Sequence, residues 1–279
     1  MVLILNFEKM KKKFYFPIFI SAYLIFGCEG SEIVDVNIDY KEYVVARGEL
    51  FADSIFTGVS FTKTLPLDET YEITKAEMKD VFAYLKINGV QVIPLHYTAR
   101  GIYKPLYDIK IQAANTYELF AKVNGKSIYA STYVPEVPRI NNAVFHSNEY
   151  VDVYIASRPN ECYGSVFYVG FSQNNYSAKS SDFHSIVEAL NTNFNDIVLS
   201  RTEEIPEQFR TPIYRAVTYI QVYSFDLAYS DYFKTRGSNQ SISNSFIQGG
   251  EPIAWNVKGE KAIGLFVGMN KSRIETVKQ

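Results

Sequence analysis

Residues 116–134 read TYELFAKVNGKSIYASTYV, and this stretch decides the fold class. Asn124-Gly125 stands between two runs of alternating apolar and polar side chains, and Asn-Gly tolerates the positive φ angles that a tight hairpin turn requires. One face of the first strand is expected to carry Tyr117, Leu119, Ala121 and Val123, opposite Ile128, Ala130 and Thr132 of the second strand. The stretch therefore predicts a β-hairpin.

The same arrangement occurs upstream, where residues 81–95 read VFAYLKINGVQVIPL with Asn88-Gly89 between two apolar runs. Other runs with strand-like alternation complete this half of the chain: residues 33–40, 42–51 and 55–65. A short acidic turn or a single helix is expected between Leu67 and Lys79. About seven short strands before residue 135 predict an immunoglobulin-like β-sandwich.

The stretch VPEVPRINN, residues 134–142, carries two prolines within five positions and predicts a domain boundary, because proline interrupts strand ladders. Beyond it, long strands are expected over residues 143–156, 165–171 and 211–225, and helices over 181–190 and 226–236. We therefore expect a mainly all-β protein: an immunoglobulin-like β-sandwich domain (28–136), then a β-rich C-terminal domain (137–279) with one or two short helices.

The first 27 residues have the outline of a signal peptide. Lys11, Lys12 and Lys13 precede a run without charge from Phe14 to Phe26. This run is too short to cross a bilayer as a helix, which requires roughly 20 apolar residues. The segment before Met10 adds nothing that a signal needs, so we expect translation to begin at Met10.

The tetrad Ile25-Phe26-Gly27-Cys28 resembles the lipobox of bacterial lipoproteins. The resemblance implies that Cys28 receives a diacylglyceryl group and becomes the first residue after cleavage, with acyl chains that anchor the folded body to a membrane. The alternative is a plain secreted protein in which Cys28 has no such role. Cys162 is the only other cysteine, so it would lack a disulfide partner and is interpreted as a small apolar residue.

The composition limits the classes of partner. Removing residues 1–27 takes away four lysines and one glutamate, so the formal charge moves from −2 to −5. A mildly acidic chain without a basic stripe disfavours nucleic-acid binding. The 22 tyrosines and 20 phenylalanines fit a strand-rich protein, and part of them could serve a partner.

Several stretches together resemble the Bacteroidota-type surface lipoproteins that are described only as a domain of unknown function and are often encoded beside TonB-dependent transporters. The stretches are VVARGEL (44–50), TKTLPL (62–67), YASTYVPEVPRI (129–140), SFDLAYSDYFKTR (224–236) and EPIAWNVKGEKAIGLFVG (251–268). The last departs from the family pattern at Glu260, where a second glycine is usual. The resemblance implies an outer-membrane lipoprotein, facing outward, with a transporter barrel as its partner.

No catalytic residue is predicted. The chain has no G-x-S-x-G nucleophile elbow, H-E-x-x-H motif or C-x₂-C pair. We interpret His96, His146 and His184 as surface or edge residues, and expect no metal and no cofactor. Carboxylates such as Glu149 and Asp152 are interpreted as solvated.

One ligand-site prediction remains. Trp255, the single tryptophan, stands near glycines and polar residues, and would meet a ligand together with the loops 172–181 and 237–250. The alternative is a core tryptophan.

These observations predict a non-enzymatic, lipid-anchored lipoprotein of the outer membrane that serves as a binding or lid accessory of a TonB-dependent transporter. A fimbrial or adhesive structural subunit is the alternative. A hydrolase hidden on a β-sandwich is a third reading, because sequence alone does not exclude two convergent carboxylates.

Overall fold

A computed structural model describes residues 40–66, 68–146, 149–170, 177–179, 182–189, 196–204, 207, 217–236 and 252–275. Glu42–Gln279 form one compact unit. Cys28, the predicted signal peptide and all but the last residue of the predicted strand at 33–40 lie outside the described residues, as do most of 172–181 and all of 237–250.

The fold is mainly β, as predicted. The strands of the first half are β1 (Val44–Phe51), β2 (Val59–Lys63), β3 (Phe82–Ile87), β4 (Gln91–Ala99), β5 (Ile102–Lys104), β6 (Thr116–Val123) and β7 (Lys126–Tyr133), with the short helix α2 (Ile73–Ala76) where a turn or helix was expected. Both predicted hairpins are present. Asn88 and Gly89 have φ angles of 49° and 71°, and Asn124 and Gly125 have 50° and 81°.

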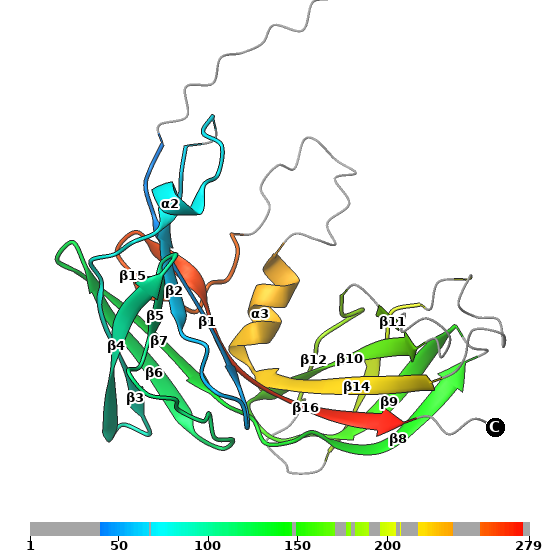
Figure 1. Cartoon of the computed structure of the whole chain (residues 1–279). Helices are drawn as coiled ribbons and strands as arrows, with labels where there is room; N and C mark the ends of the chain where they lie inside the picture. The colour runs from blue at the N-terminus through cyan, green and yellow to red at the C-terminus, as the bar shows by residue number, and fades with distance from the viewer. Residues whose placement is uncertain are drawn as a thin grey trace, which may run out of the picture. The chain divides into compact units, whose positions relative to one another are not determined.

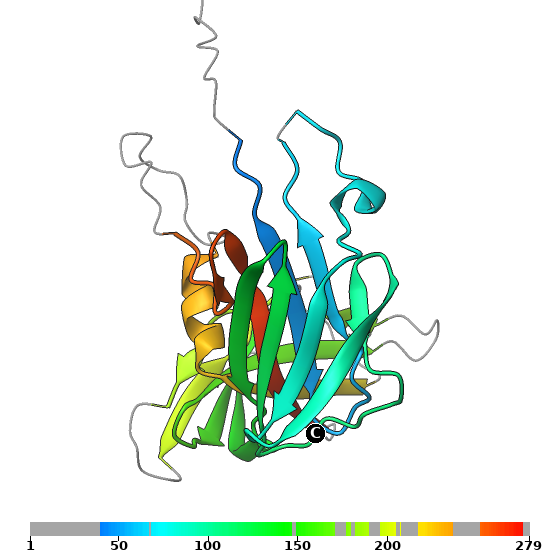
Figure 2. The same ribbon diagram turned by 90° about the vertical axis from the view of Figure 1, so that its left-hand side faces the viewer.

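These strands form a sandwich-like arrangement in which β4 belongs to both layers. Its first part, Gln91–Leu95, pairs with β3, and its second part, from His96, pairs with β5. Figure 2 shows β6 and β7 in front of β1 and β16. The core between the layers includes Leu50, Phe61, Leu85 and Leu119, each at most 1% exposed.

The strands of the second half are β8 (Arg139–His146), β9 (Tyr150–Ala156), β10 (Glu161–Gly170), β11 (Ser177–Lys179), β12 (Val187–Glu188), β13 (Ile197–Arg201), β14 (Val217–Asp226), β15 (Lys258–Gly259) and β16 (Ala262–Glu275). A separate sheet has the order β13-β9-β8. Its inner face buries Val151, Val153 and Ile155 against Tyr163 and Ile220.

The last strand connects the two halves. β16 pairs parallel with β1 through its first part, where Gly264 lies opposite Ala46, and antiparallel with β14 through its last part (Figure 1). The sheet is therefore continuous across the predicted boundary at 136/137. Residues 134–138 lie outside any strand, as expected for a connection. The division into two domains at this point stays a prediction.

The two predicted helices of the second half have different outcomes. The helix over 226–236 is confirmed as α3 (Ala228–Thr235), which buries Phe233 against Phe225 and Cys162. The prediction of a helix over 181–190 is wrong for the described residues 182–189, because Val187–Glu188 form strand β12 against β10. Pairing there satisfies backbone groups on the open edge of β10. This tertiary interaction outweighs the local helix propensity of the segment.

Candidate functional site

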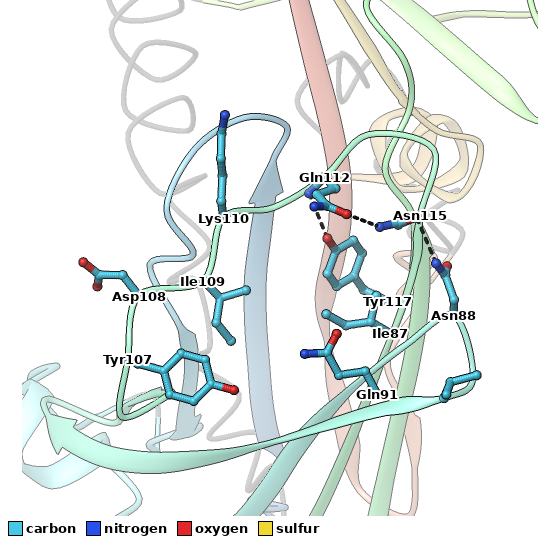
Figure 3. Close-up of a pocket in the computed structure, with 11 residues that line it drawn as sticks. Ile87, Asn88, Gln91, Tyr107, Asp108, Ile109, Lys110, Gln112, Asn115 and Tyr117 are labelled. Carbon is cyan, nitrogen blue, oxygen red and sulfur yellow. Dashed lines mark hydrogen bonds between the residues drawn. The ribbon is translucent and has the colours of Figure 1, made fainter.

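A pocket of about 600 Å³ lies between the β3–β4 turn and the segment that leads into β6 (Figure 3). We call it the amide pocket, because four of its polar side chains are amides. It is lined by Ile87, Asn88, Val90, Gln91, Tyr107, Asp108, Ile109, Lys110, Gln112, Asn115 and Tyr117. Its volume lies within the range of small-molecule binding sites, roughly 300–1,000 Å³.

One wall is held by a chain of amide hydrogen bonds. The Asn88 side chain donates to Oδ1 of Asn115 at 2.8 Å, and the Asn115 side chain donates to Oε1 of Gln112 at 3.1 Å. The backbone N–H of Thr116 donates to Oδ1 of Asn88 at 2.9 Å, which ties the hairpin turn to the start of β6. The Gln112 backbone N–H donates to the hydroxyl of Tyr117 at 2.9 Å. These contacts fix the wall before any ligand binds.

The opposite wall, residues 107–111, is held by the loop after β1. Phe56 N–H donates to the Ile109 carbonyl at 2.8 Å, Asp53 N–H donates to the Ile111 carbonyl at 2.8 Å, and Ile111 N–H donates to the Ser54 carbonyl at 2.9 Å. Ile111 is 1% exposed and anchors this wall in the core. Asp53 has a φ angle of 63°, which places it in the left-handed region where aspartate is one of the tolerated residues.

Several polar groups that line the amide pocket remain open to a ligand. Tyr107 is 62% exposed, and Figure 3 shows its hydroxyl pointing toward the Gln91 side chain across the pocket. Within the described part of the chain, neither the Tyr107 hydroxyl nor the Gln91 amide has a hydrogen-bond partner, and Nε2 of Gln112 has none either. The pocket thus offers donors and acceptors on prearranged walls.

The charges at the pocket lie at its rim. Lys110 Nζ is 3.0 Å from Oδ1 of Asp53, and both side chains are exposed. Asp108 and Lys110 point away from the pocket in Figure 3. The interior is therefore lined by neutral side chains.

Trp255 lies elsewhere, and the structure does not bring it into the amide pocket. Its ring is half-buried and packs 5.4 Å, centroid to centroid, from Tyr232 of α3, while the neighbouring Ala254 N–H donates to the Thr235 hydroxyl at 2.8 Å. The loop 237–250, predicted as its companion, lies outside the described residues, and of 172–181 only 177–179 are described. The observed contacts give Trp255 a packing role on α3.

A second hollow, of about 370 Å³, borders the predicted domain boundary and includes Glu136 and Arg158. Arg158 Nη2 lies 3.0 Å from Glu136 Oε2, and its Nη1 lies 3.8 Å from Oε2 of the buried Glu161. Burial raises the pKa of Glu161 to about 7, although the Tyr163 hydroxyl donates to its carboxylate at 2.7 Å. The arginine between these two carboxylates gives the group the features of a structural ion-pair network.

The predictions for the histidines, and for the carboxylates that were interpreted as solvated, have mixed outcomes. His96 and His184 are exposed, as predicted, and His146 is half-buried at the end of β8. Asp152, interpreted as solvated, is instead 4% exposed. Arg201 donates to both of its carboxylate oxygens, at 2.7 and 2.9 Å, and these bonds hold the pKa of Asp152 below its ordinary value.

The described residues lack two further features. No cluster of three or more His, Cys, Asp or Glu side chains suited to hold a metal ion occurs among them. None of the helices that the structure describes has the length and apolar character needed to cross a bilayer.

No protein-family model matches the chain, and no curated protein is significantly similar to it in sequence. The amide pocket therefore rests on its own geometry. Sequence reasoning missed it because its residues come from three separate stretches. The available sequence signals were the Asn88-Gly89 turn and the adjacent apolar residues Leu106 and Tyr107, which the structure leaves 80% and 62% exposed.

Proposed function

We propose that this protein is a non-enzymatic, lipid-anchored protein of the outer-membrane surface that binds a small polar ligand in the amide pocket. In this role it serves as a binding or lid accessory of a TonB-dependent transporter. The observation that carries the binding role is a pocket with both walls held by hydrogen bonds, in which Tyr107 and Gln91 keep their polar ends free. Because the walls are already ordered, ligand binding has a lower entropic cost.

The anchoring part of the proposal rests on Cys28 and the lipobox-like tetrad that ends in it. The compact unit begins at Glu42, fourteen residues after Cys28. A chain of that length spans at most about 50 Å, so the folded body would stay close to the membrane surface. Two or more acyl chains on one residue are enough for stable anchoring.

The transporter partnership is supported by the resemblance of the five stretches between Val44 and Gly268 to surface lipoproteins that are encoded beside such transporters. The mildly acidic charge of −5 after removal of residues 1–27 fits a surface protein without nucleic-acid partners.

The anchor is tested by mass spectrometry of the N-terminal peptide from native membranes and by fractionation of two variants. Cys28→Ser is expected to lose the acyl chains and to be absent from the outer-membrane fraction; a form with an uncleaved leader would remain in the inner-membrane fraction. Cys162→Ser is the matched control, because it removes the other cysteine, and it should stay in the outer-membrane fraction. A free thiol at Cys28 in native material, or retention of Cys28→Ser in the outer-membrane fraction, contradicts the anchor.

The partner is tested by purifying the tagged protein from detergent-solubilised native membranes after mild crosslinking. An unrelated outer-membrane lipoprotein with the same tag is the control. We expect a TonB-dependent barrel to be enriched in near-stoichiometric amount over that control. Repeated purifications in which no such barrel exceeds the control reject the accessory role.

A further inference from the structure

Building on the proposed binding role, we propose that the amide pocket takes an uncharged, hydroxyl-rich ligand, namely a short neutral saccharide. The inference rests on the hydrogen-bonding capacity of the pocket, on its exposed aromatic ring and on the placement of its charges.

The free polar groups match hydroxyls. A side-chain amide carries both a donor and an acceptor, and a saccharide hydroxyl can donate and accept at once. Gln91 keeps both of its amide functions free, and Gln112 keeps its Nε2 donor because only its Oε1 is used, by Asn115. Tyr107 adds a hydroxyl of its own on the opposite wall.

The apolar part of the lining matches the other face of a sugar ring. Tyr107 presents an aromatic ring that is 62% exposed, and the half-buried Ile87 and Ile109 add apolar surface to the lining. A pyranose has an apolar C–H face and a polar rim, so it can lie on the aromatic ring while its hydroxyls reach the amides.

The charges argue against an ionic ligand. The one cation in the lining, Lys110, is engaged by Asp53 at 3.0 Å, whereas Asp108 has no ion-pair partner among the residues that the structure describes. An anionic ligand in the interior would therefore meet no free cation of the lining. Both charged side chains point away from the interior, where a neutral ligand would lie.

The inference is tested by titration calorimetry with maltotriose, cellotriose, mannotriose and xylotriose, and with trigalacturonic acid as the acidic comparison. At least one neutral trisaccharide should bind, and the acidic one should bind at least tenfold more weakly. Gln91→Ala and Tyr107→Ala should each raise the Kd for the neutral trisaccharide by about three- to tenfold, the range expected for one lost hydrogen bond. Tyr71→Ala is the matched control, since Tyr71 is 64% exposed and outside the pocket, and it should leave affinity unchanged.

Three results overturn the inference: no binding of any neutral trisaccharide at millimolar concentration, tighter binding of the acidic one, or binding that Gln91→Ala and Tyr107→Ala leave intact. Thermal melts of both variants verify that they fold. The outcome is separable from that of the proposed function. A protein that carries lipid and co-purifies with a barrel but binds no trisaccharide refutes only the ligand class. A protein that binds a trisaccharide but co-purifies with no barrel refutes only the accessory role.

Discussion

Thr132 and Asp226, which are 94 positions apart in the sequence, are joined by a hydrogen bond of 2.8 Å from the Thr132 hydroxyl to Oδ2 of the carboxylate. The same oxygen accepts the Tyr133 backbone N–H at 2.7 Å, and the Thr132 hydroxyl accepts the Gly268 N–H at 2.7 Å. β7, β14 and β16 therefore meet at one buried polar junction. Side chains, rather than a strand ladder, connect β7 to the other two strands there.

Thr132→Val is expected to lower the free energy of unfolding by about 2–4 kcal/mol. Valine preserves the shape, but it leaves the Gly268 N–H without its acceptor and removes one donor from Asp226, at a residue that is 2% exposed. Urea unfolding followed by circular dichroism measures the loss.

Thr98→Val is the matched control, because the Thr98 hydroxyl donates to the Ile102 carbonyl at 2.9 Å at an exposed position. It should cost under about 1 kcal/mol. Equal costs for the two variants would show that the buried junction contributes no more than an exposed hydrogen bond.

Gly264→Ala tests the parallel pairing of β1 with β16. A Cβ atom on Gly264 would lie 1.8 Å from the carbonyl oxygen of Ala46, its register partner, and the φ angle of 141° is itself unfavourable for alanine. The two strands cannot separate without loss of the ladder, so we expect a cost above about 3 kcal/mol, or failure to fold.

Gly125→Ala separates strain from collision. Gly125 also has a positive φ angle, 81°, but nothing lies within 4 Å of a Cβ atom placed there. Its cost should be about 1–2 kcal/mol, which is the penalty of the left-handed conformation alone. A Gly264→Ala protein as stable as Gly125→Ala would contradict the β1–β16 register.

The stability of the protein is expected to fall between about pH 4.5 and pH 7 because of Glu161. Burial raises its pKa from 4.5 to about 7, so the folded state keeps a proton that the unfolded state releases, and stability decreases as pH rises through this window. The full penalty above pH 7 is about 3 kcal/mol at most.

Glu161→Gln should remove that part of the pH dependence and raise the free energy of unfolding at pH 8. The amide oxygen can still accept the hydrogen bond that the Tyr163 hydroxyl donates at 2.7 Å. Glu49→Gln, at an exposed position of β1, is the control and should reproduce the wild-type pH profile. Urea unfolding of the wild type and of both variants, each at pH 5 and pH 8, measures the effect. An unchanged difference between the two pH values in Glu161→Gln would assign the dependence to other groups.

The parts of the fold that could be predicted are those encoded by neighbouring residues. Asn88-Gly89 and Asn124-Gly125 specify hairpins because the turn and both strands lie within about twenty residues. α3 was predictable from its aromatic stripe, which reaches Phe233. The pairing of β1 with β16 could not be predicted, because no local pattern links residues that are more than two hundred positions apart.

Two errors have the same physical origin. The segment around Val187 has an apolar pattern that suits a short helix, but the edge of β10 offers it backbone partners, and Phe183 and Ile186 pack over Gly164 where a Cβ would lie 2.6–2.7 Å from them. Asp152 was interpreted as solvated from its polar neighbours in the sequence, whereas its partner Arg201 is 49 positions away. Tertiary contacts decide both outcomes.

The amide pocket was missed for a related reason. Trp255 attracted the sequence-based prediction because a lone tryptophan among polar residues is conspicuous, whereas Gln91, Tyr107 and Gln112 are ordinary until the fold places them around one space. The Asn-Gly turn was interpreted as a structural feature, and Asn88 turned out to support a pocket wall as well.

Thiol chemistry provides the last prediction, because it tests the core around α3 and the fate of Cys28 together. Cys162 is fully buried, its Sγ donates to the Asp226 carbonyl at 3.4 Å, and burial raises the pKa of its thiol above the ordinary value. Folded Cys28→Ser protein should therefore not react with Ellman's reagent at pH 8 over hours, whereas the guanidinium-unfolded protein should release one equivalent. Thr98→Cys in the same background supplies an exposed thiol as the positive control and should react within minutes. Labelling of Cys162 at a similar rate would mean that the packing of β10 against α3 opens readily.

Mature protein from native membranes should likewise show one thiol after unfolding, since a Cys28 thioether does not react, and a second equivalent would contradict lipid attachment.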